Sequence, residues 1–351
     1  MADSPGRWRP RRGATDDMMR NEASGPSRRP ARFGVLMALS LVAGAFGSLQ
    51  DARAAENGTG FYLLGGRGAM AGYLPPPGVY FESDTYSYDA KLDARKSLPA
   101  GGRFVADVRS QARADFLSGT WVTPWEIAGG NLALGATLPV GRVRVGAGLE
   151  YDSPRTNRII GASLRDNATM FGDPVFSTML GWHAGKFHWN ATVMVNAPAG
   201  DYRNGELANL AFHRWATDLS GALTWFDPET GVDLSGVAGV TFNGTNPATD
   251  YRTGTEFHLE WAASKALTSA LSAGVIGYHY QQITGDSGAG AQLGAYKGRV
   301  TALGGTLAYN FTVGKTPVST RIKILREFAV ENRARGTVGL LTVSLPLTAS
   351  P

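Results

Sequence analysis

The sequence of 351 residues lacks cysteine entirely, and downstream of residue 54 it also lacks an excess of either charge. Without cysteine the chain has no disulfide bond, thiolate metal site or cysteine nucleophile, which is compatible with an exported bacterial protein. Residues 1–54 contain nine of the 34 basic and five of the 29 acidic residues, which leaves 25 basic against 24 acidic residues. Because nucleic-acid binding needs a concentrated positive surface, we expect no nucleic-acid partner.

The N-terminal arm has the pattern of a secretory signal. Arg28, Arg29 and Arg32 precede an apolar run over residues 33–49, and Ala52-Arg53-Ala54 forms a small-x-small cleavage site. A membrane anchor is the alternative, but the run is interrupted by small residues and is shorter than the ~20 residues that a spanning helix needs. We therefore predict a signal peptide over residues 1–54, with an unusually long arm before the arginines.

Between Phe187 and Leu347, apolar residues recur at every second position with polar residues between them. In residues 213–226, for example, Leu219 falls on one face of a strand and Asp218 on the other, because successive strand side chains point to opposite faces. A soluble sandwich and a membrane barrel both produce this alternation, since each has one apolar and one polar face. Other features must separate the two architectures.

Loop lengths favour the barrel. Short turns rich in Gly, Pro, Asp or Ser are predicted at residues 183–186, 227–231, 267–270 and 314–317. Long polar connections are predicted between them, at residues 153–171, 199–212, 244–252 and 284–295. Outer-membrane barrels have short periplasmic turns and long external loops. We therefore predict an all-β, antiparallel transmembrane β-barrel in the Gram-negative outer membrane, with both termini in the periplasm.

The strand count is predicted to be about twelve. Counting back from Leu347 gives nine strands between residues 173 and 347. Upstream, residues 131–152 form either one long strand bent at Pro139 or two short ones, and residues 79–89 lie either in the wall or outside it. Because single-chain barrels usually have an even number of strands, both consistent combinations give twelve. We assign residues 101–351 to the barrel and residues 55–100 to a segment that is either a plug or the first strand.

Aromatic residues cluster beside the predicted short turns. They are Trp182, Phe187, Trp189, Trp225, Phe226, Tyr309 and Phe311. This clustering is typical of a girdle at the periplasmic membrane interface. Aromatic caps on a soluble core are the alternative, but they explain the gathering at one rim poorly.

Several segments together are distinctive. They are Pro77-Gly78-Val79-Tyr80, Gly172-Asp173-Pro174 with Gly181-Trp182-His183, the run from Thr241 to Arg252, Gly277-Tyr278-His279-Tyr280-Gln281-Gln282, and Arg326-Glu327-Phe328 before Glu331-Asn332-Arg333. In these segments, and over most of the chain after residue 54, the sequence resembles the outer-membrane family known as MetA-pathway phenol-degradation proteins, or SphA-like proteins. The resemblance implies an outer-membrane channel associated with the catabolism of aromatic or other hydrophobic compounds.

The C-terminus departs from the usual pattern of outer-membrane barrels. Many of them end on an aromatic residue, whereas this chain ends with Leu345-Pro346-Leu347 and four further residues. We expect membrane lipid, lipopolysaccharide and the outer-membrane assembly machinery as partners, although the aromatic signal for that machinery is missing here.

If apolar residues face lipid, the polar residues of each strand face the lumen. The inward set then includes His188, Asn190, Thr192, Asn196, Arg214, Asp218, Asp233, His279 and Gln281. It also includes the candidate solute path, in which Glu256, His258 and Glu260 face Arg321, Lys323 and Glu327. The alternative for these six residues is a salt-bridge network that closes the lumen. Arg326 falls on the apolar face and is expected near the outer rim, where a lipid-facing arginine costs little.

We predict neither catalytic chemistry nor a cofactor. No serine lies in a recognisable nucleophile motif. A metal site built from Glu256, His258 and Glu260 is conceivable, but same-face alternation of polar residues is what any polar lumen shows. The sequence therefore indicates a channel for passive uptake of small hydrophobic or aromatic compounds. A barrel whose long loops bind a surface partner or lipid is the first alternative, and an outer-membrane lipid hydrolase is the second.

Overall fold

A computed structural model describes residues 56–58, 60–97, 103–153, 158–291 and 294–349 of the chain. The predicted signal peptide lies outside these residues. Among the described residues, no helix is both long enough and apolar enough to span a membrane.

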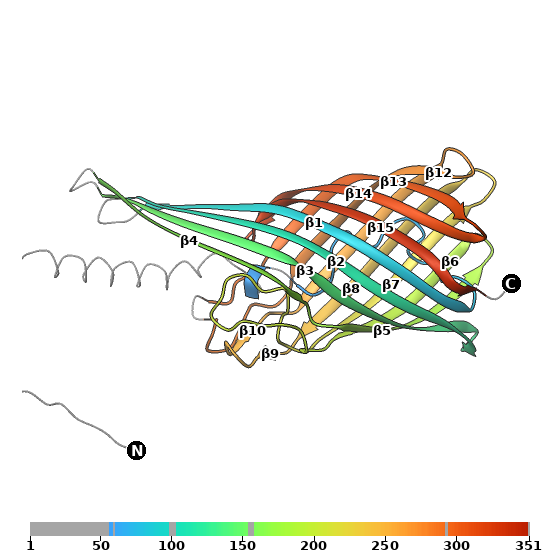
Figure 1. Cartoon of the computed structure of the whole chain (residues 1–351), viewed down its shortest axis with the longest axis horizontal. Coiled ribbons are helices and arrows are strands. Elements are labelled where there is room, and N and C mark those ends of the chain that lie inside the picture. The colour runs from blue at the N-terminus through green and yellow to red at the C-terminus, as the bar shows by residue number, and fades with distance from the viewer. Residues whose placement is uncertain (1–55, 59, 98–102, 154–157, 292–293, 350–351) are drawn as a thin grey trace, which may run out of the picture. The chain divides into compact units, whose positions relative to one another are not determined.

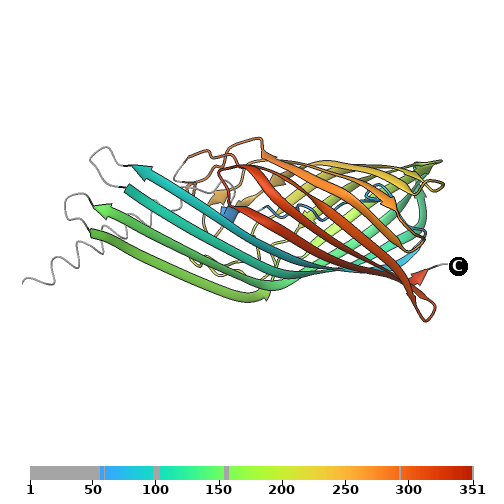
Figure 2. The same cartoon turned by 90° about the horizontal axis from the view of Figure 1, so that it is seen from above.

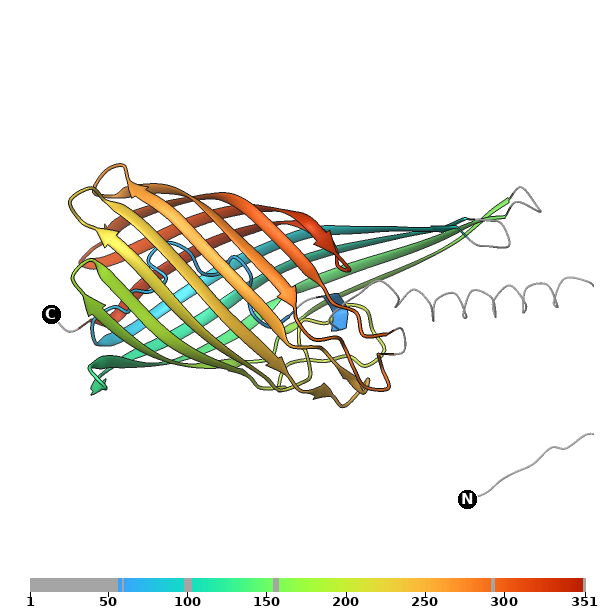
Figure 3. The ribbon, with the colours of Figure 1, turned by 180° about the vertical axis from the view of Figure 1, so that it is seen from behind.

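Twelve strands of the described chain close into an antiparallel β-barrel, which confirms the predicted fold class and strand number (Figures 1 and 3). They are β1 (Gly78–Ser97), β2 (Arg103–Ile127), β3 (Gly130–Ser153), β5 (Val175–Ala184), β6 (Phe187–Asn196), β7 (Ala216–Asp227), β8 (Val232–Asn243), β11 (Glu256–Ala266), β12 (Leu271–Gln282), β13 (Arg299–Val313), β14 (Thr316–Glu331) and β15 (Arg335–Ala349). Neighbours in sequence pair with each other, β1 pairs with β15, and β3 pairs with β5 across the position of β4.

Strand β4 (Arg158–Phe171) corrects the prediction of a loop over residues 153–171. It pairs with β3 from Val140 onward, whereas β5 pairs with β3 only up to Thr137. Pro139 lies where β3 changes partners, a position at which the missing N–H of proline is tolerated. Because β4 lies beyond the part of β3 that pairs with β5, it needs no lipid-facing apolar face. Its sequence therefore lacks the alternation on which the prediction relied.

Strands β1 to β3 are much longer than the rest of the barrel wall. They contain 20, 25 and 24 residues, whereas β5 and β6 contain 10 residues each. Together with β4 they continue past the rim at which the other strands end (Figure 2). The predicted strand over residues 79–89 is thus the first half of β1, so the first strand of the wall lies within residues 55–100, as one of the two alternatives had it.

The distribution of side chains is inverted relative to a soluble protein. Trp215, Leu223 and Leu234 are 61%, 52% and 49% exposed, whereas Asp218 and Thr224 are fully buried. A water-soluble sandwich buries its large apolar residues, so this inversion requires lipid around the outside of the barrel.

The two rims of the barrel differ in their connections. Tight turns join β5 to β6, β7 to β8, β11 to β12, and β13 to β14, as predicted. Gly185, Gly231 and Gly314 lie in three of these turns with φ angles of 58°, 68° and 62°, which glycine adopts without steric cost. The other rim has the long connections, one of which contains the two-residue strands β9 (Thr245–Asn246) and β10 (Tyr251–Arg252). We call the two ends the short-turn rim and the long-loop rim.

Residues 56–58 and 60–77, which we call the inner segment, run through the barrel interior before β1 begins (Figures 1 and 3). The segment starts with a short 3-10 helix (Glu56–Gly58), whose Glu56 N–H donates to Thr253 in the long-loop rim. It leads to Gly78, which pairs with Ala349 of β15 and Val122 of β2 at the short-turn rim. The inner segment therefore passes from the long-loop rim to the short-turn rim. The location of both termini in the periplasm stays a prediction.

Candidate functional site

The barrel interior has two different surfaces, with the inner segment between them. A polar arc on β6, β7, β8 and β11 includes the buried residues Asn190, Asp218, Asp233, Glu256, His258 and Glu260. An apolar arc on β12 to β15 includes the buried residues Ile276, Val300, Ala302, Leu325, Val338 and Leu340. Leu63, Leu64 and Ala69 of the inner segment pack against the apolar arc.

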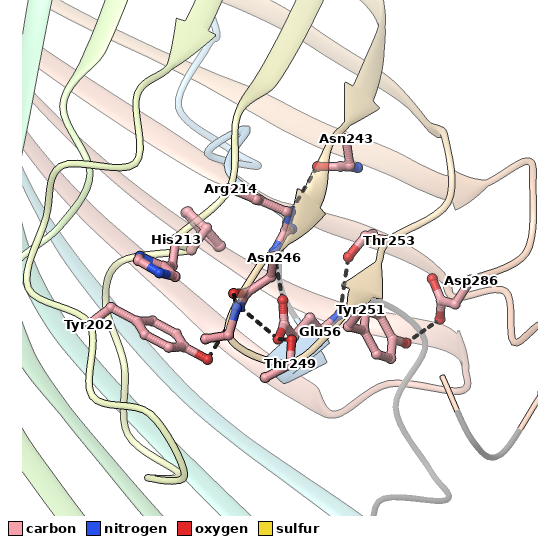
Figure 4. A network of polar contacts seen from close by, with 12 residues as sticks. Glu56, Tyr202, His213, Arg214, Asn243, Asn246, Thr249, Tyr251, Thr253 and Asp286 are labelled. Carbon is pink, nitrogen blue, oxygen red and sulfur yellow. Dashed lines mark hydrogen bonds and ion pairs between the residues drawn. The ribbon is translucent and has the colours of Figure 1, made fainter. Parts of the chain in front are cut away.

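A hydrogen-bonded cluster surrounds Glu56 at the long-loop rim (Figure 4). The Glu56 carboxylate accepts hydrogen bonds from Asn246 Nδ2 at 2.9 Å and Thr249 Oγ1 at 2.6 Å. Arg214 Nη1 lies 3.4 Å from Glu56 Oε2, and both side chains are buried. Tyr202 Oη accepts a hydrogen bond from Asn246, and burial raises the pKa of this hydroxyl above its ordinary value. The start of the inner segment is thus held by the long loops.

A polar contact point lies further inside, where Tyr62 meets the polar arc. The Tyr62 ring stacks on His258 with centroids 3.5 Å apart, and His258 Nε2 lies 2.8 Å from Asp218 Oδ2. Thr241 Oγ1 donates to the same Asp218 oxygen at 2.6 Å. Tyr62 also lies beside Glu260, and the buried hydroxyl and the buried carboxylate interact with each other.

Two basic residues of β14 hold the middle of the inner segment through backbone carbonyl oxygens. Lys323 Nζ donates to Gly65 O at 3.0 Å and Arg67 O at 3.3 Å, and also to Gly66 O. Arg321 Nη1 donates to Ala69 O at 3.2 Å. An ammonium group has three donors, so three carbonyl oxygens satisfy the buried Lys323 completely.

Glu327 is surrounded by tyrosines at the edge of the apolar arc. Its carboxylate accepts hydrogen bonds from Tyr278 Oη at 2.8 Å and Tyr88 Oη at 2.9 Å. A third tyrosine, Tyr280, donates to Glu256 Oε1 at 2.6 Å. The aromatic rings thus continue the apolar surface while their hydroxyls satisfy the two buried carboxylates.

The last part of the inner segment is fixed near the short-turn rim. Met70 N–H donates to Asp233 Oδ2 at 3.0 Å, and Gly72 N–H donates to Thr224 Oγ1 at 2.9 Å. Asn190 Nδ2 donates to Ala71 O at 2.9 Å. A Cβ atom on Gly72 would lie 2.4 Å from a backbone oxygen of β6, so only glycine fits this close approach.

The six residues of the predicted solute path all point into the interior, but they do not face one another as charged partners. Glu256 binds Tyr280, His258 binds Asp218, and Lys323 binds the inner segment. Among the described residues, no ion pair joins the acidic residues of this set to Arg321 or Lys323. The alternative of a salt-bridge network between these two groups is therefore not what the structure contains. Their part in solute passage stays a prediction.

The predicted orientation of β12 is wrong. His279 and Gln281 face outward, and His279 Nδ1 lies 2.9 Å from Thr301 Oγ1 on the outer face. Tyr278, Tyr280 and Gln282 are the inward residues. In residues 271–280, apolar residues occur on both faces of the strand, so alternation alone does not determine which face points into the barrel. The inner tyrosines and the contact residues of the inner segment were missed because neither belongs to an alternating polar series.

Within the part of the chain that the structure describes, no group of three or more His, Cys, Asp or Glu side chains is arranged to hold a metal ion. His258 with Glu256 and Glu260 therefore does not form such a cluster. The hydrogen bonds above give these residues structural partners instead.

The family described as "Putative MetA-pathway of phenol degradation" matches residues 94–342. No curated protein sequence matches the chain. Among solved structures, the chain is similar to the COG4313 outer membrane channel from Pseudomonas putida F1, with a TM-score of 0.58 and 16% identity over 81% of this chain and 99% of that chain. At this identity the similarity establishes the fold.

Two further solved barrels are more distant. A FadL homologue of Pseudomonas aeruginosa has a TM-score of 0.38 and 10% identity, over 84% of this chain and 96% of that chain. The CymD monoaromatic hydrocarbon channel has a TM-score of 0.36 and 10% identity, over 83% of this chain and 96% of that chain.

Proposed function

Because the chain belongs to the family described as "Putative MetA-pathway of phenol degradation", we propose that it is an outer-membrane channel for passive entry of small hydrophobic or aromatic compounds. The observation that carries the proposal is the apolar arc inside the barrel, formed by Ile276, Val300, Leu325, Val338 and Leu340. A general porin has a polar, water-filled interior. An apolar inner surface instead favours solutes that leave water readily.

Solute size follows from the strand number. Barrels of about eight strands are filled by side chains, and barrels of sixteen or more leave an aqueous channel. A twelve-stranded barrel with an inner segment leaves room for a small molecule only after that segment moves. The solute would pass between the inner segment and the apolar arc, where Leu63 and Leu64 now pack. The Tyr62 hydroxyl and the Glu260 carboxylate, which lie beside each other, would contact a polar substituent such as a phenolic hydroxyl.

The proposed orientation places the short-turn rim in the periplasm and the long-loop rim outside, as in other outer-membrane barrels. The C-terminal strand then ends on the periplasmic side. Glu56 lies near the outer opening, so the inner segment enters the barrel from the outside end. A compound arriving from the medium would first meet the Glu56 cluster and would then follow the inner segment inward.

Solute flux into liposomes tests this function. Liposomes that contain the mature protein should take up a small monoaromatic compound faster than a sugar of similar size, and the uptake should saturate. Leu340→Ser, which places a hydroxyl on the apolar arc, should slow aromatic uptake. Leu341→Ser is the matched control, because Leu341 is the next residue on the same strand and faces lipid with 42% exposure.

Two results would contradict the proposal. One is uptake of both solutes no faster than that of empty liposomes, which would reject the channel and favour the alternative in which the long loops bind a surface partner. The other is an equal effect of the two leucine substitutions, which would mean that the solute does not contact the apolar arc.

A further inference from the structure

Basic side chains gather on the outer face of the barrel at the long-loop rim. Arg335 of β15 pairs with Lys91 of β1, Lys91 pairs with Arg109 of β2, and the same row ends at Arg165 of β4. The neighbouring row runs from Arg326 of β14 through Thr337, Asp89 and Gln111 to Arg144 of β3. We call Lys91, Arg144, Arg165, Arg326 and Arg335 the basic band. Its members come from five strands, and with β2 between β1 and β3 the band spans six neighbouring strands.

The basic band points away from the interior. On β14, Leu325 and Glu327 are buried inside, so Arg326 between them faces outward. On β1, Tyr88 and Ala90 are buried inside, so Lys91 faces outward. The pairing partners of these residues share their face, because paired residues of an antiparallel sheet project to the same side. The band therefore lies on the outer surface and takes no part in the interior contacts.

The band lies at the edge of the apolar belt. On β14 the outward residues before Arg326 are Ile324 and Ile322, which are 60% and 49% exposed. On β2 and β3 the paired residues Leu117 and Leu138 lie in the same exposed belt. Arginine on the lipid face is strongly disfavoured at the midplane of a membrane and costs little near an interface. The change from aliphatic to basic residues on β14 is thus what a boundary between lipid tails and headgroups requires.

The positive charge of the band is not neutralised by neighbouring carboxylates. Asp89, which lies on the same face, already binds Arg113 Nη2 at 2.7 Å and Gln111 Nε2 at 2.8 Å. Within the described residues, Lys91, Arg144, Arg165 and Arg335 have no acidic partner. Arg326 has one polar contact, the hydrogen bond of 2.7 Å that it donates to Thr337 Oγ1. These basic residues line one groove of about 1150 Å³.

We propose that this groove binds the phosphate groups of the outer-leaflet lipid. Guanidinium groups bind phosphate through two parallel hydrogen bonds, which makes arginine well suited to this headgroup. Lipopolysaccharide, the glycolipid of that leaflet, carries phosphates beside its acyl chains. One molecule would place its chains along Ile322 and Ile324 and its phosphates among Arg326, Arg335 and Arg144. The proposal rests on the proposed orientation and is independent of which solute crosses the barrel.

Lipid binding to the purified mature protein tests the proposal. The probes are bisphosphorylated lipid A, the same lipid without its phosphates, and inorganic phosphate. The test variant is Arg144→Ala with Arg335→Ala. The control variant is Lys265→Ala with Lys315→Ala, which removes the same charge from exposed positions at the short-turn rim. Each cation near a membrane surface contributes about 1 kcal/mol, so the test variant should bind bisphosphorylated lipid A about 30-fold more weakly than wild type.

The expected result is preference for the phosphorylated lipid, loss of that preference in the test variant, and near wild-type binding in the control variant. Equal binding of both lipids by wild type would overturn the proposal, as would equal weakening in the two variants. Competition by inorganic phosphate at the same concentration would assign the groove to a free anion instead of a lipid. Aromatic flux through the test variant should equal that of wild type, because the band lies outside the barrel. Failure of lipid binding is thereby distinguishable from failure of the channel.

Discussion

Lys323 of β14 donates a hydrogen bond of 3.0 Å to the carbonyl oxygen of Gly65, which lies 258 residues away in the sequence. The same ammonium group binds the carbonyl oxygens of Gly66 and Arg67. A buried charge without partners is strongly disfavoured, so the lysine and the inner segment stabilise each other. This contact joins the inner segment to the wall beside the apolar arc. Any displacement of the inner segment from this wall requires that Lys323 release its three carbonyls.

Replacement of this lysine should open the barrel. Lys323→Met keeps an unbranched side chain of nearly the same length but removes its donors, and leaves three carbonyl oxygens without their partner. A hydrogen bond to a charged group contributes about 1.5–3 kcal/mol, so displacement of the inner segment should become favoured by about one order of magnitude or more. Single-channel recording in planar bilayers should show higher conductance or longer open periods than wild type. Lys315→Met in the β13–β14 turn is the matched control, and equal behaviour of the two variants would contradict this role of Lys323.

A second prediction concerns the close approach of Gly72 to the wall. A Cβ atom at this position would lie 2.4 Å from His188 O and 2.7 Å from Thr224 N, and neither backbone atom can move away cheaply. Gly72→Ala should therefore displace this end of the inner segment. Gly68→Ala is the control, because the nearest atom to its Cβ would be the flexible Lys323 side chain at 3.5 Å.

Thiol labelling measures this displacement directly, since the chain has no cysteine of its own. A reporter cysteine introduced by Ala69→Cys should react faster in the Gly72→Ala background than in wild type. In the Gly68→Ala background it should react at the wild-type rate. Equal rates in all three proteins would show that the inner segment tolerates the clash without leaving the wall.

The barrel was predictable from the sequence because lipid imposes a simple rule on each strand. Positions that face the membrane are apolar, so the alternation of residues such as Asp218 and Leu219 identifies a strand and shows which of its faces points to lipid. Together with the turns, this alternation predicts the number of strands. The inner segment follows no such rule. Its partners include backbone carbonyls held by Lys323, and a carbonyl oxygen carries no sequence signal. The same limit explains β12, where apolar residues on both faces leave the orientation to packing against Leu63 and Leu64.

The stack of Tyr62 on His258 yields a prediction about stability. His258→Ala removes the ring under Tyr62 and one of two hydrogen-bonding partners of the buried Asp218 carboxylate, the other being Thr241. Loss of one partner of a buried polar group costs about 1–3 kcal/mol, and more when that group is charged. Thermal unfolding in detergent should therefore occur at a lower temperature than in wild type. In the double variant His258→Ala with Asp218→Ala, part of the loss should be recovered, because no unpaired carboxylate remains.

An unchanged unfolding temperature for His258→Ala would show that the Asp218 contact is unimportant for stability. An additive loss in the double variant would show that the two side chains act independently. His279→Ala is the control for loss of a histidine, because His279 lies on the outer face and its side chain forms a hydrogen bond with Thr301 there.

The loop before β7 should loosen at acidic pH. Arg203 in this loop lies 3.0 Å from the Asp166 carboxylate of β4, and Ala208 N–H donates to Asp166 at 2.7 Å. Burial alone would raise the pKa of Asp166, but the Ala208 N–H and the Arg203 guanidinium together hold it below its ordinary value. When folding lowers the pKa of a carboxylate, that carboxylate stabilises the folded state at every pH above the pKa that it has in the unfolded chain. This stabilisation is lost as the pH falls through the folded pKa, which lies below about 4.

Amide exchange of residues 203–208, corrected for the intrinsic pH dependence, measures this loss. Protection should be constant from neutral pH down to about pH 4, near the ordinary pKa of aspartate, and should fall at lower pH as Asp166 becomes protonated. Asp166→Asn should show low protection throughout, because the amide cannot form the ion pair with Arg203. Constant protection in wild type down to the lowest pH would mean that apolar packing of Leu207 and Leu210 holds the loop by itself. The substitution separates these causes, since it removes the charge and leaves that packing intact.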